Sequence, residues 1–247
     1  MQITFIGTAS GLSVTHRSHA SILFETDGYG TLIDCGEGTT RSLVKLGIDT
    51  NSIERVIISH THPDHCAGLP LLLQYMHLIG RENPLKIYLP KGMKDTFLRF
   101  LEQLYMISET LPFDYTIEEY GAEETITGGG LTIEPIPNRH LEDKAEIARK
   151  YGISLATFSL VAKTGDKIVY YSADIKDAED FSLPAKTDIA IVESTHIDLE
   201  AAMQIAAARR IKRLIFTHIH PDVEGVALTD KFGLQAEFAY DGLTVNI

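Results

Sequence analysis

The sequence predicts an α/β fold in which mixed β-sheets are covered by helices. The first observation is order, because short β-type runs and helical segments interleave along the chain. The second is size, since 247 residues with 44% hydrophobic content suit one globular domain or two small ones with a sizeable core. The third is that several apolar strands run straight into polar segments that contain histidine, which is where α/β sheets keep their sites.

The first half of the chain begins with strands and then alternates. Runs of β-type residues bounded by turn residues predict strands at 3–7, 21–25, 31–34, 55–59 and 85–89. The dipeptide Asp27-Gly28 predicts a tight turn between the second and third strands. Apolar residues at helical spacing predict helices at 39–46, 69–79 and 93–107. Gly47 and Gly80 follow the first two helices and are suited to ending them.

The second half continues the same alternation. We expect strands at 113–120, 131–135, 157–162, 167–172, 189–193, 214–217 and 243–247. The three glycines at 128–130 predict a hairpin turn. An alanine-rich run predicts a helix at 200–210, and a short charged segment at 141–152 predicts one more.

Charge and cysteine content narrow the class of protein. There are 22 Lys and Arg residues against 34 Asp and Glu residues, giving a formal net charge of −12, which disfavours binding to nucleic acid by charge alone. Two cysteines, Cys35 and Cys66, are too few for a disulfide scaffold and are typical of free thiols in a reducing compartment. The chain has no run of about 20 apolar residues and no signal-peptide pattern, so we expect a cytoplasmic protein that does not enter a membrane.

The strongest local pattern is HTHPDH at 60–65, directly after the predicted strand 55–59. Imidazoles and carboxylates are natural ligands of zinc-type ions. In extended backbone, residues two apart point to the same side, so His60 and His62 can share one metal. Asp64 and His65 begin the next helix and can face a second metal. The alternative is a solvated histidine-rich turn, which the dense cluster after a buried strand disfavours.

Further ligands must come from later strand ends. His140, Asp174 and His218 each lie shortly after an apolar strand, as the first cluster does. His220 lies two residues beyond His218 and could face the same way, so it remains an alternative for the last ligand.

Three motifs together resemble a known family. HTHPDH continues as CAGLP at 66–70, and this segment is similar to the metal-binding motif of the metallo-β-lactamase fold superfamily. DCGEGTTR at 34–41 and FIGTASG at 5–11, with Arg17 after it, resemble segments of the ribonuclease Z group, the tRNA 3′-processing endonucleases. The resemblance covers essentially the whole chain. It implies a four-layer αβ/βα sandwich, formed as a single domain over 1–247, with two mixed sheets, outer helices and a binuclear site at one edge.

The resemblance also assigns metal ligands. It implies that the first metal is held by His60, His62 and His140, that the second is held by Asp64, His65 and His218, and that Asp174 bridges both. It places Asp34 beside this site, as a partner that orients a ligand histidine. The alternative for Asp34 is an ordinary turn residue at a strand end.

Two ions about 3.5–4 Å apart can share a hydroxide that serves as the nucleophile for hydrolysis of an ester. Asp64, near this hydroxide, would accept a proton or hold the nucleophile in line. Zinc is the default ion for a histidine-rich site, while the carboxylates would also accept manganese or iron.

A candidate general acid follows the strand 189–193. His196 and Glu193 resemble the histidine of ribonuclease Z that protonates the leaving group and the glutamate that assists it. Only two residues separate them here, whereas the family has a longer loop. The alternative is that Asp198 caps the following helix and His196 merely precedes that cap.

The substrate is less constrained than the metal ligands. Ribonuclease Z enzymes carry a Gly- and Pro-rich arm that grips tRNA, and the short segment 141–152 has no such composition. A small phosphodiester, such as a cyclic nucleotide or an aryl phosphodiester, therefore fits better than tRNA, although an RNA 3′ end belongs to the same reaction class. Two other functions stay open on this fold, namely an acyl hydrolase of lactones or thioesters and a non-catalytic ligand-binding protein.

The helix at 69–79 is more apolar than one buried face requires. We expect part of it to meet a second subunit in a homodimer, with simple burial in the sandwich as the alternative.

Overall fold

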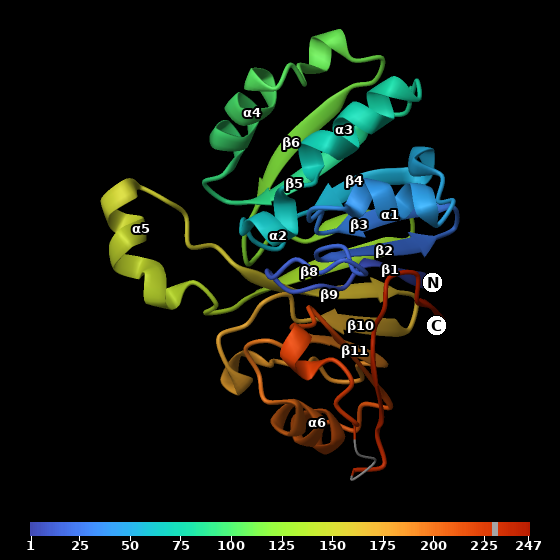
Figure 1. The fold of residues 1–247 in the computed structure, drawn as a ribbon, viewed down its shortest axis with the longest axis vertical. Coiled ribbons are helices and arrows are strands. Elements are labelled where there is room, and N and C mark those ends of the chain that lie inside the picture. Colours follow the sequence, from blue (N-terminus) through green and yellow to red (C-terminus); the bar gives the residue numbers. More distant parts are fainter. Residues whose placement is uncertain (229–231) are drawn as a thin grey trace.

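The main feature of the fold is a pair of stacked β-sheets with helices outside them (Figure 1). The structure is a computed structural model that describes residues 1–228 and 232–247. One sheet has the strand order β14-β1-β2-β3-β4-β5-β6, and the other has the order β13-β12-β11-β10-β9-β8-β7. Each sheet combines parallel and antiparallel pairs. The predicted αβ/βα sandwich with two mixed sheets and outer helices is therefore confirmed.

The two sheets and their helices have the following bounds. The first sheet contains β1 (Gln2–Gly7), β2 (Ser21–Thr26), β3 (Tyr29–Ile33), β4 (Ile53–Ile57), β5 (Leu85–Pro90), β6 (Tyr115–Tyr120) and β14 (Thr244–Asn246). The second sheet contains β7 (Ile126–Gly128), β8 (Leu131–Pro137), β9 (Phe158–Thr164), β10 (Lys167–Tyr171), β11 (Ile189–Glu193), β12 (Arg213–Thr217) and β13 (Gln235–Phe238). The α-helices are α1 (Thr39–Lys45), α2 (Pro63–Cys66), α3 (Leu69–Leu78), α4 (Lys94–Gln103), α5 (Ala145–Tyr151) and α6 (Leu199–Ala208). The 3₁₀ turns are η1 (Thr50–Ser52), η2 (Ser108–Thr110), η3 (Glu142–Lys144), η4 (Ala178–Asp180) and η5 (Pro221–Val223).

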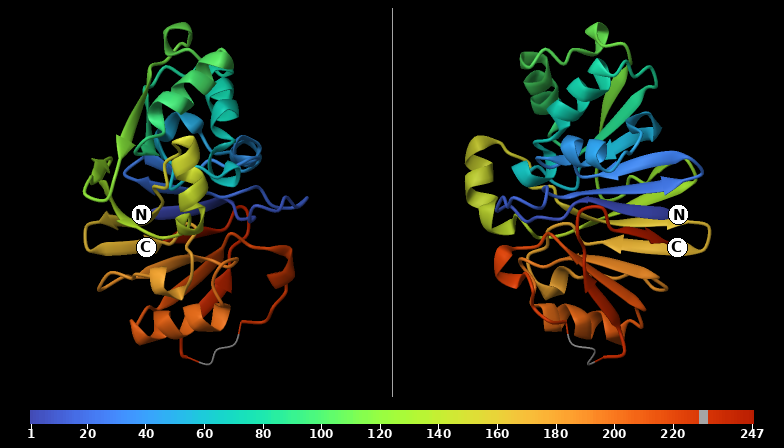
Figure 2. Two further views of the ribbon diagram at one scale, coloured as in Figure 1. Left: turned by 90° about the vertical axis from the view of Figure 1, so that its left-hand side faces the viewer. Right: turned by 45° about the vertical axis from the view of Figure 1, so that its right-hand side comes forward.

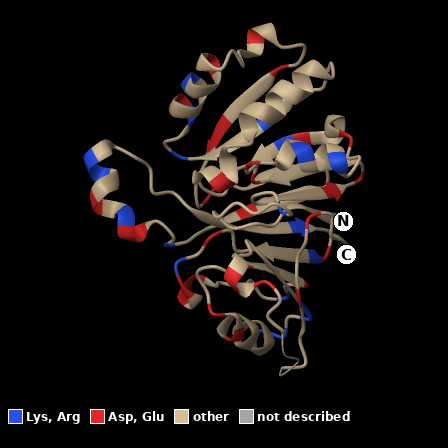
Figure 3. Cartoon of the chain, in the orientation of Figure 1, with Lys and Arg blue, Asp and Glu red and all other residues tan. Residues whose placement is uncertain are grey.

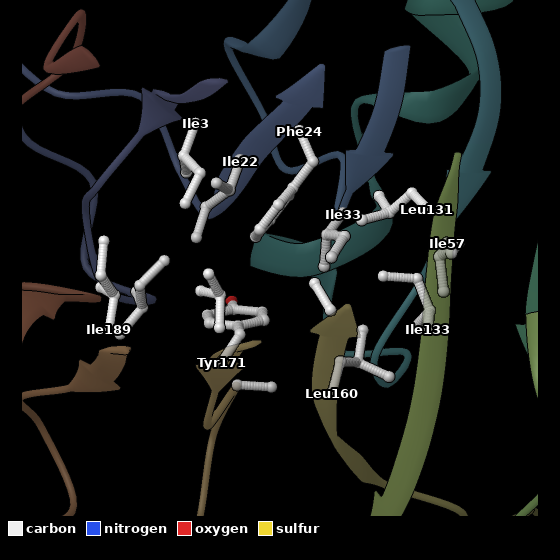
Figure 4. Packing of buried hydrophobic residues seen from close by; sticks show 14 of the residues in the cluster. Ile3, Ile22, Phe24, Ile33, Ile57, Leu131, Ile133, Leu160, Tyr171 and Ile189 are labelled. Carbon is white, nitrogen blue, oxygen red and sulfur yellow. The ribbon is translucent and has the colours of Figure 1, made fainter. Parts of the chain in front are cut away.

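The central core lies between the two sheets. Side chains from both inner faces point toward one another there, with Ile22 and Phe24 of the first sheet opposite Leu160 and Tyr171 of the second (Figure 4). A second apolar cluster joins the first sheet to α1, α3 and α4, and a third joins the second sheet to α6. Burial of apolar surface at about 25 cal/mol per Å² is the main force that holds such layers together.

Strand direction determines where the functional residues gather. Strands β3 to β6 run parallel to one another, and so do β10 to β13. Their carboxyl ends meet at one edge of the sandwich, which is the usual place for a site in α/β sheets. The segments that follow β3, β4, β8, β10, β11 and β12 all contribute to this edge.

Most predicted elements are present, but the long helix predicted at 93–107 is wrong in length. Helix α4 ends at Gln103, and Tyr105 has a left-handed φ of 63°. The amide of Met106 donates to the carbonyl of Leu101 at 2.9 Å, which closes the last turn. A non-glycine residue in this conformation leaves few clues in a sequence, which is why the end was missed.

The loops confirm several local predictions. Asp27 and Gly28 have positive φ angles in the turn between β2 and β3, and the glycines at 128–130 turn the chain from β7 to β8. The segment 141–152, predicted as one helix, is divided into η3 and α5. This segment projects from the body of the molecule in Figure 1 and in the right-hand view of Figure 2. It carries charges of both signs (Figure 3).

Within the described residues, none of the helices combines the length and the apolar character that a membrane crossing requires.

Candidate metal centre

Seven side chains from five segments converge at the edge where the parallel strands end. His60 and His62 follow β4, while Asp64 and His65 lie in α2, whose first residue Pro63 suits the start of a helix. The others follow the ends of β8, β10 and β12. They form two groups, one of His60, His62, His140 and Asp174 and one of Asp64, His65, His218 and Asp174. Within each group the possible ligand atoms lie within 4.8 Å of one another.

The first group is built on three imidazoles. The ring centroids of His60 and His62 are 4.8 Å apart, and each lies 5.0 Å from the centroid of His140. The Nε2 atom of His140 is 3.2 Å from Nδ1 of His62. Three imidazole nitrogens that face one point are the donor set expected for a zinc-type ion.

The second group shares Asp174 with the first, and the two carboxylate oxygens are divided between them. Oδ2 of Asp174 lies 3.8 Å from Nε2 of His60 and 3.7 Å from Nε2 of His140. Oδ1 lies 3.2 Å from Nε2 of His65 and 3.4 Å from Nε2 of His218. One carboxylate therefore faces both groups, with one oxygen toward each.

The donor atoms have the character that a cation site requires. Nε2 of His60, Nε2 of His65 and Oδ1 of Asp174 are buried and have no hydrogen-bond partner among the described residues. A buried polar atom without a partner is costly, and an explanation such as an ion is expected for it. The residues present are therefore suited to binding a divalent metal ion at this edge of the fold.

Burial and charge set the protonation of these groups. Burial lowers the pKa of His60, and the neighbouring His65 lowers it further, so the imidazole is neutral and free to donate a lone pair. Burial alone would raise the pKa of Asp64, but the hydrogen bond from His218 and the charge of His65 bring that pKa to about 2. Burial would likewise raise the pKa of Asp174, and the charges of His218 and His65 hold it well below its usual range. Both carboxylates are thus ionised at neutral pH.

Asp34 orients the second group from beneath. It is fully buried, and its Oδ2 accepts hydrogen bonds from His65 Nδ1 at 2.8 Å, Tyr171 Oη at 2.9 Å and Ser59 Oγ at 3.0 Å. Its Oδ1 accepts the amide of Ser59 at 2.7 Å. Because Nδ1 of His65 donates to Asp34, Nε2 of His65, which faces Asp174, is the nitrogen that a bound cation would take in place of a proton. The structure therefore places Asp34 as an orienting partner rather than as a simple turn residue.

Glycines allow the DCGEG segment to lie against the motif at 60–65. A Cβ atom on Gly36 would sit 2.1 Å from the carbonyl oxygen of Asp64, and one on Gly68 would sit 2.1 Å from the carbonyl oxygen of Gly36. These approaches are open only to glycine. The amide of Cys35 donates to the carbonyl of His65 at 2.7 Å in the same contact. Cys35 and Cys66 are free, as predicted, and both are buried, and burial raises the pKa of the Cys66 thiol to about 12.

Glu193 and His196 form a pair beside the two groups. Oε1 of Glu193 is 2.9 Å from Nδ1 of His196, and its Oε2 accepts the amides of Thr195 and His196. The hydrogen bond to Glu193 raises the pKa of His196 above its ordinary value. The ring centroid of His196 is 5.0 Å from that of His140. Asp198 does cap α6, accepting the amide of Ala201 at 2.9 Å, so the capping alternative and the pairing with Glu193 are both present.

His220, the alternative to His218, lies outside both groups. Its Nδ1 accepts a hydrogen bond from the amide of Asp222 and so caps η5.

The structure also brings residues to the site that the sequence did not single out. Tyr171 reaches Asp34, and Thr195 Oγ1 lies 3.2 Å from Nδ1 of His218. No pattern in the surrounding sequence marks either residue as part of the site, because each contacts a side chain that is distant in the sequence.

Asp180 accepts hydrogen bonds from two segments that supply candidate ligands. It accepts hydrogen bonds from the backbone amide and the side chain of Arg139 at 3.0 Å and 2.8 Å, and from the amide of Lys176 at 3.0 Å. Arg139 precedes His140, and Lys176 follows Asp174 by two residues, so this carboxylate links the segments that supply two of the candidate ligands.

Comparison with solved structures and with curated sequences shows which proteins this chain resembles. The short form of human tRNase Z superposes with a TM-score of 0.77 at 21% sequence identity, covering 100% of this chain and 99% of that one. Zn²⁺-bound PqqB from Methylobacterium extorquens gives a TM-score of 0.73 at 16% identity and covers 100% of both chains. In sequence, the ribonuclease Z of Methanothermobacter thermautotrophicus is 27% identical over 89% of this chain and 86% of its own length.

The fold, the candidate metal centre and these relatives define a ribonuclease Z-like hydrolase with the metallo-β-lactamase fold. The family resemblance inferred from the motifs is thereby confirmed. More narrowly, the sequence model of the family described as Anti-Pycsar protein Apyc1 matches residues 1–192, and the chain belongs to that family.

The orientation of His65 by Asp34 leads to a testable prediction. We expect Asp34→Asn to lower the affinity for a divalent metal about 10–100-fold, because an amide in place of the carboxylate presents a donor to Nδ1–H of His65. This conflict favours the tautomer with the proton on Nε2, the nitrogen that faces Asp174. Zinc affinity measured by competition with a chromogenic chelator checks the expectation.

The matched control is Asp188→Asn, which alters a carboxylate that accepts the amide of Ile168 beside the amino-terminal end of β11. It should bind metal as the unmodified protein does. Unchanged metal affinity in folded Asp34→Asn protein would contradict an orienting role.

Proposed function

We propose that the chain is a binuclear metal-dependent phosphodiesterase. The observation that carries this proposal is Asp174, whose two carboxylate oxygens face two separate groups of imidazoles. A carboxylate in this position suits a bridge between two cations. The pair of Glu193 and His196 beside it supplies a proton donor of the kind that an alkoxide leaving group needs.

The metal assignment is part of the proposal. His60, His62 and His140 would hold the first ion, Asp64, His65 and His218 the second, and Asp174 both. Zinc is the ion of choice because imidazoles dominate the donor set, and PqqB, a protein of the same fold, is Zn²⁺-bound in its crystal structure. Manganese and iron are the alternatives that the carboxylates would accept.

The metal ions and the side chains of the protein would contribute different parts of the reaction. When bound, two such ions activate a water molecule as nucleophile and stabilise negative charge on phosphate oxygens. Asp64, partly exposed beside His218, can accept a proton or hold the nucleophile in line. Glu193 fixes Nδ1 of His196, so that Nε2 of that ring carries the proton delivered to the leaving oxygen.

A small phosphodiester is the proposed substrate, with a cyclic nucleotide or an aryl phosphodiester as examples. The net charge of −12 disfavours a polyanion. The segment 141–152 forms η3 and the seven-residue α5 rather than a Gly- and Pro-rich arm, and we propose that the chain acts as a single domain over 1–247 without such an arm. An RNA 3′ end, which the resemblance to ribonuclease Z suggests, is the other member of this class. We also propose a cytoplasmic location.

The metal assignment predicts a stoichiometry of two ions per chain. Asp174→Ala should lose both, because it removes the shared carboxylate, whereas His218→Ala should mainly weaken the second. Metal analysis after dialysis against limiting zinc counts the ions directly. His220→Ala is the matched control, since that ring caps η5, and it should retain two ions. One ion per chain at saturation would refute the binuclear centre.

The role of His196 predicts a dependence on the leaving group. A p-nitrophenolate departs without a proton, whereas a ribose alkoxide needs one, and general acid catalysis there contributes about 10²–10⁴ in rate. His196→Ala should therefore lose most activity on a dinucleotide or cyclic nucleotide and little on bis(p-nitrophenyl) phosphate. Steady-state rates on both substrates, at matched metal content, provide the measurement.

Asp64→Ala is the comparison variant and should impair both substrates. Equal losses on the two substrates in His196→Ala would remove this histidine from the acid role. A panel of lactones and thioesters run in parallel separates the phosphodiesterase from an acyl hydrolase.

We further propose a homodimer that forms through α1 and α3. Val44, Leu71 and Leu78 are 51%, 57% and 74% exposed, and a shallow hollow of about 450 Å³ lies between the two helices. Light scattering at micromolar concentration should give the mass of two chains, and Leu78→Glu should shift it to one chain. Ile153→Glu changes an equally apolar exposed residue elsewhere and should leave the dimer intact. A monomer mass for the unmodified protein would reject this interface.

A further inference from the structure

Two candidate ligands of the first group, His140 and Asp174, are brought together without a main-chain link. His140 follows β8 and Asp174 follows β10, and β9 lies between these two strands in the sheet. Among the described residues, no backbone–backbone hydrogen bond joins the segments 138–141 and 172–177. Nε2 of His140 nevertheless lies 3.7 Å from Oδ2 of Asp174. The relative position of these two ligands therefore depends on contacts that other side chains make.

One carboxylate, that of Asp180, joins both segments. Its Oδ2 accepts the amide of Arg139, directly before His140, at 3.0 Å. The same oxygen accepts the amide of Lys176, two residues after Asp174, also at 3.0 Å. Burial alone would raise the pKa of Asp180, but the hydrogen bonds from Arg139 and Lys176 hold that pKa below its ordinary value, so the acceptor is ionised. Hydrogen bonds to an ionised acceptor are roughly twice as strong as those between neutral groups.

The Asp180 side chain is itself held in place and is only 6% exposed. Its Oδ1 accepts Nε of Arg139 at 2.8 Å. The next residue, Phe181, is buried in the cluster between the second sheet and α6, with its ring centroid 5.6 Å from that of Tyr170 in β10. Asp180 is therefore attached to the packed body of the second sheet, although it lies in a turn.

A second link, between neutral groups, lies behind the ligands. Oγ of Ser159 in β9 accepts Nδ2 of Asn138 at 3.3 Å and donates to the carbonyl oxygen of Ser172 at 2.7 Å. It joins the same two segments, two residues before each ligand. Ser159 thus holds the ends of the strands, whereas Asp180 holds the turns beyond them, in which the ligands lie.

The two groups of candidate ligands depend on Asp180 unequally. His140 and Asp174 are two of the four residues in the first group, whereas the second group contains only Asp174 of this pair. The other residues of the second group lie in α2 or follow β12, and no hydrogen bond from Asp180 reaches those segments among the described residues. Loss of the Asp180 carboxylate should therefore disturb the first group more than the second.

We propose that Asp180 is a positioning residue for the first metal ion, because it sets the position of His140 relative to Asp174. This inference rests on the proposed binuclear centre, in which His60 and His62 complete the first site. Outer hydrogen-bond partners of metal ligands typically contribute about 10–100-fold to metal affinity. Removal of Asp180 should therefore change the balance between the two ions.

The test measures the two ions separately. In cadmium-loaded protein each bound ion gives its own cadmium NMR signal, and His140→Ala identifies the signal of the first ion by abolishing or shifting it. Stepwise competition with a chelator then gives the affinity for each ion. We expect Asp180→Ala to lower the affinity for the first ion about 10–100-fold and to change the affinity for the second much less.

Two further variants sharpen the comparison. The amide oxygen in Asp180→Asn can still accept both backbone amides, but its NH₂ group cannot accept Nε of Arg139, so the loss at the first ion should be smaller than in Asp180→Ala. Glu179→Gln is the matched control. That carboxylate belongs to the same turn, is 85% exposed and lies 3.4 Å from Nη2 of Arg139, but it accepts no amide from either ligand segment among the described residues. Both affinities should be unchanged in Glu179→Gln.

A general loss of stability would have a different signature. Asp188→Ala removes a carboxylate that accepts the amide of Ile168 at the opposite end of β10, so it should affect both ions alike or neither. Equal weakening of the two ions in Asp180→Ala, or unchanged affinity for the first, would overturn the positioning role and leave the binuclear centre intact. If Asp180→Ala does not fold, the same criterion is applied to Asp180→Asn. Unmodified protein that binds fewer than two cadmium ions at saturation would refute the binuclear centre itself, and the role of Asp180 with it.

Discussion

The site depends on one buried carboxylate, that of Asp34. An ionised carboxylate away from water is stable only when its oxygens are fully hydrogen-bonded. Here four donors supply those bonds, from Ser59, His65 and Tyr171. Asp34 follows β3 of one sheet, and Tyr171 ends β10 of the other, so the same carboxylate joins the two sheets at the edge where the candidate ligands converge. One group therefore both orients His65 and contributes a polar contact between the two sheets.

Backbone strain is concentrated in the same place. Asp34, Ala173 and His218 have φ angles of 58°, 47° and 52°, in a region that non-glycine residues seldom occupy. Each lies within two residues of a strand end, and two of them precede or supply a candidate ligand. Each such residue costs about 1–3 kcal/mol, and it persists only where surrounding contacts enforce it. The tight turns let a strand end present a side chain along the edge of the sheet instead of continuing its pleat.

The sequence predicts those parts of the fold and site in which the residue type and its spacing determine the chemistry. The strand before the HTHPDH segment, the start of a helix at Asp64 and His65 and the sandwich implied by the family motifs are all present. The roles of residues whose contacts lie far away in the sequence could not be predicted in this way. Tyr171 looks like any inward-facing strand residue until its hydroxyl meets Asp34, and Asp180 looks like a solvated loop carboxylate until it links Arg139 to Lys176. The early end of α4 at Gln103 was missed because Tyr105 adopts a conformation that glycine usually marks.

The distribution of charge explains why a strongly acidic chain can still attract an anion. Three carboxylates, those of Asp34, Asp64 and Asp174, lie in or under the centre, and they would not fully neutralise the two divalent cations that we propose for it. With both ions bound, a small positive excess would be confined to the edge of a protein whose net charge is −12. Acidic side chains also lie near His196, among them Asp198 at the start of α6, whereas Glu224 is paired with Arg17 and His16. One phosphodiester anion would be drawn to such a centre, whereas each additional phosphate on the same molecule would lie over a chain whose net charge is −12. Selection for a small substrate then follows from the contrast between centre and surface, without an arm that measures the length of a nucleic acid.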